Sequence, residues 1–335
     1  MKKIRIVQIG IAHDHAEPTA ISLKRLSDDF ELVGYFAPEE EKRRYADRLR
    51  VFEGYPELSV EQIMSDPTID AVAIETAEKD LAKYALMAAR AGKHVQMDKP
   101  GGMELSEFDE LVCTVKEKKM AFQTGYMYRY NPYIKNLIER AKNGELGEIF
   151  SVEAHMSCRH SVGKRQWLAE LGKGGMTFFL GCHLIDIIYQ ILGEPERIIP
   201  LTRSTGIDSV TANDYGMVVL EYKNGVSFIK TTAEERGGVS RRQVVVTGSK
   251  GSVEIKPLEK KIPGGLLVTE KTEWLGHTDN EWNFAGEHFV SESFDRYIPM
   301  LLGFAELARG ERENPFTPDY ELELYKLLLR CCDMM

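Results

Sequence analysis

The hydrophobic positions in the first part of the chain form short continuous runs, and each run is followed by a stretch with helical spacing. The runs are rich in β-branched residues and lie at 4–9, 31–36, 70–74, 94–97 and 121–124. Short, mainly apolar runs of this length are typical of strands that are buried on both faces. Their regular alternation with helical patterns predicts right-handed βαβ units and therefore an α/β fold with a doubly wound parallel sheet.

The pattern changes after residue 196, where strand-like segments follow one another closely. They lie at 197–201, 214–222, 226–232, 242–247, 252–255 and 266–270. Asn224-Gly225 is typical of a β-hairpin turn between two of them. Helical patterns at 289–309 and 320–333 end the chain. We therefore expect two domains: residues 1–124 with the parallel sheet, and residues 125–335 with an open, largely antiparallel sheet covered by helices.

Composition narrows the possible partners and the compartment. The chain has 335 residues, enough for two hydrophobic cores, and its net charge of −9 argues against nucleic acid or an anionic membrane as a partner. Its five cysteines lack C-x-x-C spacing, which indicates reduced thiols in the cytoplasm. The first apolar run ends at Gly10, too early for a secretion signal, and no apolar stretch reaches membrane-spanning length.

The turn after the first apolar run is a weak candidate for binding a dinucleotide. A G-x-G-x-x-G turn lets backbone N–H groups approach a pyrophosphate at a helix N-terminus. This chain has Gly10-Ile11-Ala12-His13-Asp14-His15, so only the first glycine is kept. Ala37 stands after the second strand, where an acid would contact a ribose hydroxyl in an NAD-binding domain. These residues alone predict only a strand–turn–helix unit. They do not decide whether NAD or NADP would be the cofactor.

A more specific stretch is Ala91-Gly92-Lys93-His94-Val95-Gln96-Met97-Asp98-Lys99-Pro100. Gly92 suits the end of a helix, and a short apolar strand follows it. Pro100 forces Lys99 into an extended conformation directly after that strand. Because ligands of open α/β sheets bind at the carboxyl ends of strands, Lys99 is a candidate functional residue. The stretch resembles A-G-K-H-V-x-x-[DE]-K-P, a signature of the Gfo/Idh/MocA family, in which the lysine is catalytic and lies beside the nicotinamide.

Two further stretches carry the same resemblance. Residues 125–132, from Gly125 to Pro132, are similar to the family's G-[FY]-x-x-R-[FY]-x-P, which lines the interdomain cleft. Residues 174–186 resemble G-G-G-x-x-x-D-x-G-x-H-x-x-D, with His183 and Asp186 in place. Phe179 stands where the family has its first acid. This departure removes a hydrogen-bond acceptor for a polyol and supplies an aromatic face instead.

The resemblance implies a Rossmann-like first domain, NAD or NADP as cofactor, and oxidation or reduction of a hydroxyl or carbonyl group of a carbohydrate or related small molecule. Lys99 and His183 would form the acid–base pair, and the second domain would support a homodimer or homotetramer. The implied cofactor-binding residues are Gly10, Ile11, Ala12, His13, Ala37, Thr76, Asp98 and Lys99. The implied substrate-binding residues are Tyr126, Tyr128, Arg129, Trp167, Phe179 and Asp186.

Two other functions stay open at this point. Departures from the family pattern at Ala12, Ala37, Ala77 and Phe179 are compatible with a nucleotide-binding regulatory protein without redox turnover. A cofactor that stays bound could also support elimination or glycoside cleavage through transient oxidation. We expect no dedicated metal site, because neither His13-Asp14-His15 nor the group His155, Cys158 and His160 has a recognised ligand spacing.

Overall fold

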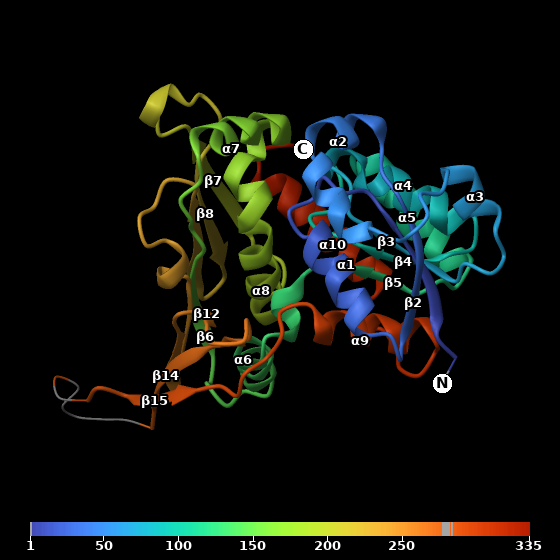
Figure 1. Cartoon of the computed structure of the whole chain (residues 1–335). Helices are drawn as coiled ribbons and strands as arrows, with labels where there is room; N and C mark the ends of the chain where they lie inside the picture. Colours follow the sequence, from blue (N-terminus) through green and yellow to red (C-terminus); the bar gives the residue numbers. More distant parts are fainter. Residues whose placement is uncertain (1, 277–281, 283) are drawn as a thin grey trace. The chain divides into compact units, whose positions relative to one another are not determined.

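The first sheet of the protein, in a computed structural model that describes residues 2–276, 282 and 284–335, has five parallel strands in the order β2-β1-β3-β4-β5 (Figure 1). The strands are β1 Ile4–Ile9, β2 Phe30–Phe36, β3 Ala71–Ile74, β4 His94–Met97 and β5 Phe122–Thr124. The register aligns Ile9, Ile74, Met97 and Thr124. Four strands therefore end at the same level, and the residues that follow them meet at one edge of the sheet.

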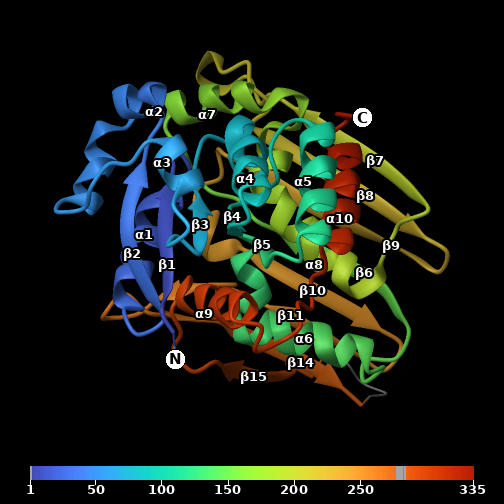
Figure 2. The same cartoon turned by 90° about the vertical axis from the view of Figure 1, so that its right-hand side faces the viewer.

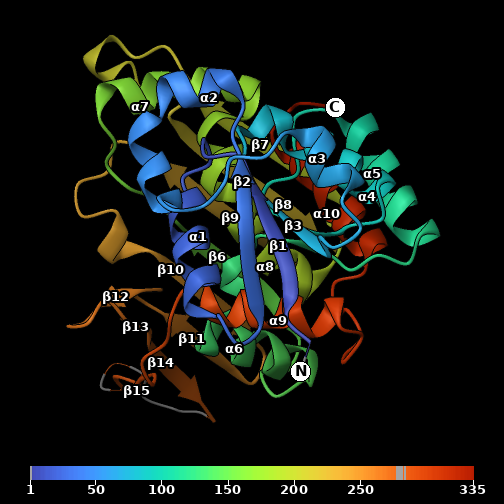
Figure 3. The same cartoon turned by 45° about the vertical axis from the view of Figure 1, so that its right-hand side comes forward.

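Helices cover both faces of this sheet. They are α1 Ala16–Arg25, α2 Glu39–Arg44, η1 Ala46–Phe52, α3 Val60–Ser65, η2 Glu78–Asp80, α4 Leu81–Arg90, α5 Leu105–Glu117 and α9 Ile298–Ala308. Helices α1 and α9 lie side by side (Figure 3), and Leu23 and Phe304 from them join Ile6 of β1 in one core cluster. Helices α4 and α5 also lie side by side (Figure 2). Residues such as Val7 alternate with Ile6 along the strand and fill the opposite face.

The second sheet has eight strands in the order β15-β14-β11-β10-β6-β9-β8-β7. Their bounds are β6 Ile149–His155, β7 Arg197–Arg203, β8 Tyr215–Tyr222, β9 Gly225–Thr232, β10 Gln243–Gly248, β11 Gly251–Ile255, β14 Glu270–Leu275 and β15 Glu287–Val290. Every described pairing in it is antiparallel except that of β6 with β9. A small separate ladder joins β12 Lys260–Lys261 to β13 Leu267–Val268.

The helices that accompany this sheet are η3 Met127–Tyr130, α6 Pro132–Lys142, α7 Val162–Trp167, η4 Leu168–Gly174, η5 Thr177–Gly181, α8 Cys182–Leu192, η6 Ile207–Ser209 and η7 Val239–Arg241. The last helix, α10 Pro318–Cys331, is divided: its residues up to Tyr325 cluster with the first sheet, and those from Lys326 cluster with the second. Helix α8 is almost entirely buried and contacts β6 and β9. The predicted α/β fold, with a parallel sheet and a largely antiparallel one, is confirmed.

The chain divides into two compact units, and each unit uses two separate segments. The first unit comprises residues up to Met127 together with Tyr297–Tyr325, and the second comprises Tyr128–Arg296 together with Lys326–Met335. The predicted division, 1–124 and 125–335, assigned the returning segment to the second domain. It clusters with the first unit because Leu301 and Phe304 of α9 lie in the first unit's core.

One predicted element is wrong. Residues 289–309 were expected to form one helix, but β15 ends at Val290 and α9 begins only at Ile298. Pairing with β14 favours the extended form of the first residues, where Glu287, His288, Phe289 and Val290 each face a β14 residue. Among the described residues no single helix is long and apolar enough to cross a membrane. The segments Val162–Gly174 and Thr177–Leu192 reach the length and apolar composition of a membrane span only when they are joined, and a bend of 76° separates them.

Candidate functional site

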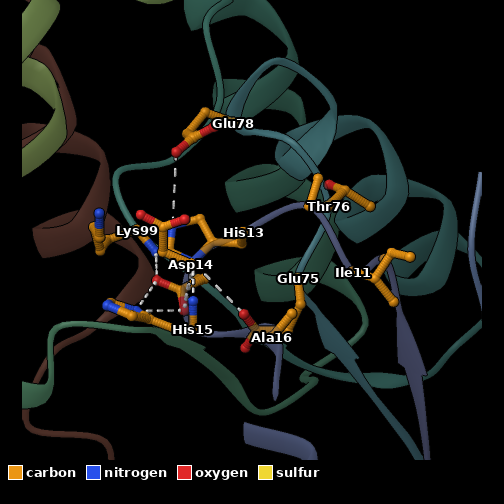
Figure 4. A network of polar contacts seen from close by, with 12 residues as sticks. Ile11, His13, Asp14, His15, Ala16, Glu75, Thr76, Glu78 and Lys99 are labelled. Atoms are coloured by element: carbon orange, nitrogen blue, oxygen red, sulfur yellow. Dashed lines mark hydrogen bonds and ion pairs between the residues drawn. The ribbon is translucent and has the colours of Figure 1, made fainter. Parts of the chain in front are cut away.

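The aligned strand ends of the first unit place several titratable side chains together. His13 and His15 follow β1, Glu75 follows β3, and Asp98 and Lys99 follow β4. Figure 4 shows the two imidazoles converging, with Glu75 and Lys99 beside them. Apart from His15, which is half-buried, each of these side chains is at most 2% exposed. The parallel register therefore gathers residues far apart in sequence into one buried polar cluster.

Asp98 is the centre of this cluster. Its Oδ2 lies 3.2 Å from His13 Nδ1 and 2.9 Å from His15 Nδ1. Its Oδ1 accepts a hydrogen bond from the backbone N–H of Lys99 at 2.6 Å. Gly125 is required at the end of β5, because a Cβ there would lie 2.8 Å from the same Oδ1. Asp98 therefore ties the turn after β1 to the lysine after β4.

Burial and neighbouring charges shift the pKa values of the residues in this cluster in different directions. Burial opposes ionisation of Asp98, but the charges and hydrogen bonds of His13 and His15 outweigh it and hold the pKa of that carboxyl well below its usual range. Burial, reinforced by the charge of Asp98, raises the pKa of Glu75 well above its usual value. Burial also lowers the pKa of His15 to about 4, against the opposing pull of Asp98. At neutral pH the cluster therefore contains an ionised Asp98 next to a neutral His15, and the raised pKa of Glu75 favours its protonated form.

The turn after β1 is an anion-binding turn, and in this structure a side chain of the protein itself fills it. The backbone N–H groups of Ile11 and Ala12 donate to Glu41 Oε2 at 2.7 and 3.0 Å, and that of Ala77 donates to Glu41 Oε1 at 2.9 Å. Gly10 has a φ of +95°, and a Cβ there would lie 2.3 Å from the Thr76 nitrogen. The turn therefore approaches the end of β3 as closely as a glycine allows, which lets three backbone donors converge on one carboxylate.

Arg48 holds the other side of the same turn. Its Nη1 donates to the carbonyl oxygens of Ile11, Ala12 and His13 at 3.0, 2.6 and 2.8 Å. With its carbonyls bound by Arg48, the turn keeps its N–H groups directed toward Glu41. Neither Glu41 nor Arg48 was predicted, because both lie in a charge-rich stretch whose pattern indicates only a solvated helix.

The residues of this turn fit the phosphates of a dinucleotide. The donors that hold the Glu41 carboxylate are the backbone groups that a pyrophosphate uses at such a turn, and a carboxylate is an anion of similar hydrogen-bonding chemistry. Ile11 and Ala12 would hold the phosphates, and Glu41 would have to withdraw first. Burial raises the pKa of Glu41, against the backbone hydrogen bonds from Ile11, Ala77 and Ala12, so the ionised carboxylate is held there at an energetic disadvantage. The predicted cofactor residues Ala37 and Thr76 are fully buried in the same unit.

The second unit holds His183 on α8, where its ring meets the ring of Tyr128 edge to face at 5.1 Å. The Tyr128 hydroxyl donates to Glu259 Oε2 at 2.8 Å and accepts from Arg242 Nη1 at 3.3 Å. Burial, with the charge of Glu259, raises the pKa of Tyr128 to about 12. This phenol therefore stays protonated at neutral pH and fixes one face of His183.

Arg129 and Asp186, both predicted substrate contacts, bind each other. Arg129 Nε lies 3.2 and 3.0 Å from the two carboxylate oxygens of Asp186, and Nη2 lies 2.9 Å from Oδ1. Gln190 adds a hydrogen bond to Asp186 Oδ2 at 3.0 Å. Both charged side chains are 1% exposed. A buried bidentate pair three residues after His183 fits a role in positioning α8 better than direct contact with a substrate.

The aromatic substitution at position 179 belongs to a small cluster. Phe179 meets Trp167 edge to face at 5.4 Å, and Lys164 Nζ lies 3.5 Å from the Trp167 ring centre and 4.8 Å from that of Phe179. Lys164 was not predicted, and its i to i+3 spacing to Trp167 on α7 is the signal that could have found it. Tyr126, another predicted substrate residue, is buried in the first unit, whereas Tyr128, Trp167 and Phe179 belong to the second.

The doubly wound parallel sheet with an anion-binding turn after β1 defines a dinucleotide-binding domain, here followed by a second unit with its own polar site. Residues 4–126 match the model of the oxidoreductase family with an NAD-binding Rossmann fold, and residues 134–254 match the GFO/IDH/MocA C-terminal domain. The chain therefore belongs to the Gfo/Idh/MocA oxidoreductase family and is an NAD(P)-dependent enzyme of the dehydrogenase/reductase type.

Individual relatives are distant. Myo-inositol 2-dehydrogenase of Thermotoga maritima is 24% identical over 257 residues, which cover 75% of this chain and 74% of the relative. The crystal structure of aldose–aldose oxidoreductase from Caulobacter crescentus, complexed with glycerol, aligns with a TM-score of 0.77 at 19% identity and covers 99% of this chain and 98% of that one. A 3-ketoreductase of Actinomadura kijaniata, solved with NADP and TDP-benzene, aligns with a TM-score of 0.77 at 19% identity over 98% of this chain and 96% of that one.

Proposed function

We propose that the enzyme oxidises or reduces a hydroxyl or carbonyl group of a carbohydrate or related small molecule, with Lys99 and His183 as its acid–base pair. The observation that carries the proposal is the position of Lys99. It follows β4 of the dinucleotide-binding domain, it is 1% exposed, and its backbone is held by Asp98. A buried lysine at a strand end of such a domain fits a catalytic role better than a role in solvation.

Each side chain has a defined task in this proposal. The nicotinamide, when bound, supplies the hydride acceptor or donor. When a hydroxyl group is oxidised, the neutral amine of Lys99 takes its proton; when a carbonyl group is reduced, the Lys99 ammonium group binds the carbonyl oxygen and returns that proton. Asp98 orients the turn that carries Lys99 by accepting its backbone N–H. His183, whose ring contacts that of Tyr128 edge to face, moves the proton onward or orients the substrate.

The substrate class is supported from two sides. A relative is named for myo-inositol, and a structural neighbour is named for aldoses and holds glycerol. In this chain Trp167 and Phe179 supply aromatic faces of the kind that pack against the apolar face of a sugar ring. Phe179 offers no carboxylate to a hydroxyl, so we propose that recognition here depends more on stacking than on acid–hydroxyl hydrogen bonds.

The lysine assignment is tested with a panel of polyols, aldoses and ketoses with NAD⁺, NADP⁺ and their reduced forms. Lys99→Met should lower turnover by at least about 10²–10⁴-fold while dinucleotide affinity stays nearly unchanged. Lys118→Met, at an exposed position after α5, is the matched control and should behave as the wild type. Wild-type turnover by Lys99→Met on a substrate found in the panel would overturn the assignment.

His183 needs a test that separates chemistry from packing. His183→Ala should lower turnover by about 10²–10⁴-fold with little change in the circular dichroism spectrum or the melting temperature. If His183→Ala chiefly unfolds the protein, a core role for this histidine is the better account. For the stacking role, Phe179→Asp should raise KM for a sugar substrate and Phe179→Trp should preserve it.

We further propose that the enzyme is a cytoplasmic homodimer or homotetramer. All five cysteines are free thiols, as expected in a reducing compartment. One face of the second sheet presents a partly exposed row of paired residues: Ile199, Val219, Phe228, Glu153 and Val245. A largely apolar sheet face suits burial against a second copy. Light scattering that shows a 38 kDa monomer at micromolar concentration would contradict this assembly.

A further inference from the structure

We propose that His13, His15 and Asp98, together with Glu75, form a binding site for a divalent transition-metal ion such as Zn²⁺. The proposal is independent of the redox function, because the cluster's geometry carries it. A ligand atom from each of His13, His15 and Asp98 lies within 4.8 Å of the others, all in the first unit. The sequence prediction of no metal site rested on spacing alone, and the third ligand lies more than eighty residues beyond the His-x-His pair.

The separations suit a tetrahedral ion. Zinc binds histidine nitrogen and carboxylate oxygen at about 2.0–2.2 Å, which places neighbouring ligand atoms roughly 3.3–3.5 Å apart. Asp98 Oδ2 already lies 2.9 and 3.2 Å from the Nδ1 atoms of His15 and His13. To seat an ion between these three atoms, His13 Nδ1 has to release the backbone N–H of His15, from which it accepts a hydrogen bond at 3.2 Å.

Two further acids lie beside these three residues: Glu75 would supply the fourth ligand, and Glu78 would support His13 from outside the ligand shell. Glu75 Oε2 lies 3.7 Å from His13 Nδ1, and within the described part of the chain it is buried without a hydrogen-bond partner. His13 Nε2 is likewise buried without one, and Glu78 Oε1 lies 3.9 Å from it. Histidines that bind a metal through one ring nitrogen usually donate the other N–H to a carboxylate, and Glu78 stands where that acceptor is needed.

The charge of the cluster also favours a cation. Asp98, Glu75 and Glu78 are three acids with at most 4% exposure, gathered around two imidazoles and the single ammonium group of Lys99. Buried acids are unfavourable unless they are paired or coordinate a metal. A divalent ion would neutralise two of these carboxylates and would link the turn after β1 to the turn that carries Lys99. Imidazole ligands suit zinc, copper, iron and nickel, whereas oxygen ligands alone suit calcium and magnesium, so two imidazoles in the set favour a transition metal.

Metal binding by the full-length protein tests the site without reference to cofactor or turnover. After treatment with a chelator and dialysis, Zn²⁺ is titrated in competition with a chromogenic chelator. Co²⁺ is then added to record its visible absorption, and the melting temperature is measured with and without Zn²⁺. The wild type should bind a single ion, give the intense absorption of tetrahedral Co²⁺, and melt at a higher temperature with metal.

The variants decide the assignment. His15→Gln changes a partly exposed side chain, and Asp98→Asn preserves shape; each should lower Zn²⁺ affinity by more than the roughly 10–100-fold typical of outer-sphere changes, and Glu78→Gln should fall within that range. His288→Gln, at an exposed histidine of the second unit, is the control and should bind like the wild type. Equal Zn²⁺ affinity of wild type and His15→Gln, or no binding by the wild type, would refute the proposal. If Asp98→Asn does not fold, His15→Gln still decides.

Discussion

The two units each bury a group of charged side chains, but the two groups differ in how completely their partners satisfy them. In the second unit, Asp186 receives two N–H groups of Arg129 and the amide of Gln190, so its charge is balanced and its oxygens are bonded. In the first unit, Asp98 is bonded by His15 and by the backbone N–H of Lys99, but beside it Glu75 Oε2 and His13 Nε2 are buried without a hydrogen-bond partner among the described residues.

The difference teaches what each group is for. A closed ion pair with matched geometry holds a backbone in place and has no capacity left for a ligand. A buried cluster with more acceptors than donors is unfavourable by itself and becomes favourable when a cation, a proton or a substrate arrives. Glu41 is intermediate. Its carboxylate has hydrogen-bond partners, but these are the backbone N–H groups that a cofactor phosphate would also use.

The largest effect is expected from opening the closed pair. Asp186→Asn leaves the Arg129 guanidinium buried beside a neutral amide, and breaking a buried pair in this way costs about 3–5 kcal/mol. Urea unfolding followed by circular dichroism at neutral pH measures the loss. A loss below about 1 kcal/mol would show that the pair is not the anchor of α8 described here.

The same chemical change in the first unit should have a smaller effect on metal-free protein. In Asp98→Asn the amide oxygen can still accept the N–H of Lys99, and the loss of a charge beside Glu75 removes a repulsion. We expect a loss of about 1.5–3 kcal/mol, the range for hydrogen bonds to a charged group. Urea unfolding in the presence of a chelator makes the two Asp→Asn variants directly comparable, and a larger loss at position 98 would reverse the comparison.

Glu41→Gln tests whether a satisfied carboxylate can still compete with a ligand. Removing its charge should tighten dinucleotide binding by about tenfold, since hydrogen bonds to a charged group contribute about 1.5–3 kcal/mol and an amide replaces only part of this. The wild type should bind more tightly as pH falls from neutral toward the pKa of Glu41, which burial raises above 4.5, because the protonated carboxyl no longer competes as an anion. Glu41→Gln should lack this pH dependence. Calorimetric titration with NADH and NADPH measures both, and identical curves would exclude the competition.

The smallest effect is expected at Tyr128. Tyr128→Phe removes one hydroxyl from a network in which Glu259 keeps its bonds to Arg296, so a loss of about 0.5–1.5 kcal/mol is expected. Because burial raises the pKa of Tyr128 to about 12, the hydroxyl stays protonated throughout the neutral range. The shape of the pH–turnover profile should therefore be the same in wild type and variant. A shifted limb would assign the tyrosine a role in proton transfer.

The parts of the fold that follow from local pattern were predictable. The apolar runs at 4–9 and 94–97 are the strands β1 and β4, and Gly92 ends the intervening helical stretch with a positive φ of 76°. The strand at residues 287–290 was not predictable. A short sequence that is compatible with helix or strand takes the conformation that its tertiary partner favours, and the partner here is β14. The identity of the partner strand is a property of the whole chain.

The candidate site divides in the same way. Lys99 was found because a proline and a strand end mark it locally. The contact of Asp98 with His13 and His15 depends on the register of β1 with β3 and of β3 with β4, which no local pattern contains. Glu41 was missed for a related reason: it is one of three consecutive glutamates, and only the tertiary structure shows which of them turns inward.

The chain crosses between the two units three times, and the return to the first unit at Tyr297 has a consequence for biosynthesis. The first unit takes Leu301, Phe304 and Ala305 into its core, and Arg309 pairs with Asp29 at 2.9 Å. A ribosome delivers these residues only after nearly all of the second unit has been made. The amino-terminal segment of the first unit, up to Met127, must therefore wait, with part of its apolar surface uncovered, until translation is almost complete. Chains stalled shortly before residue 297 should therefore be targets for chaperones and prone to aggregation. This holds although roughly nine-tenths of the chain has been synthesised by that point.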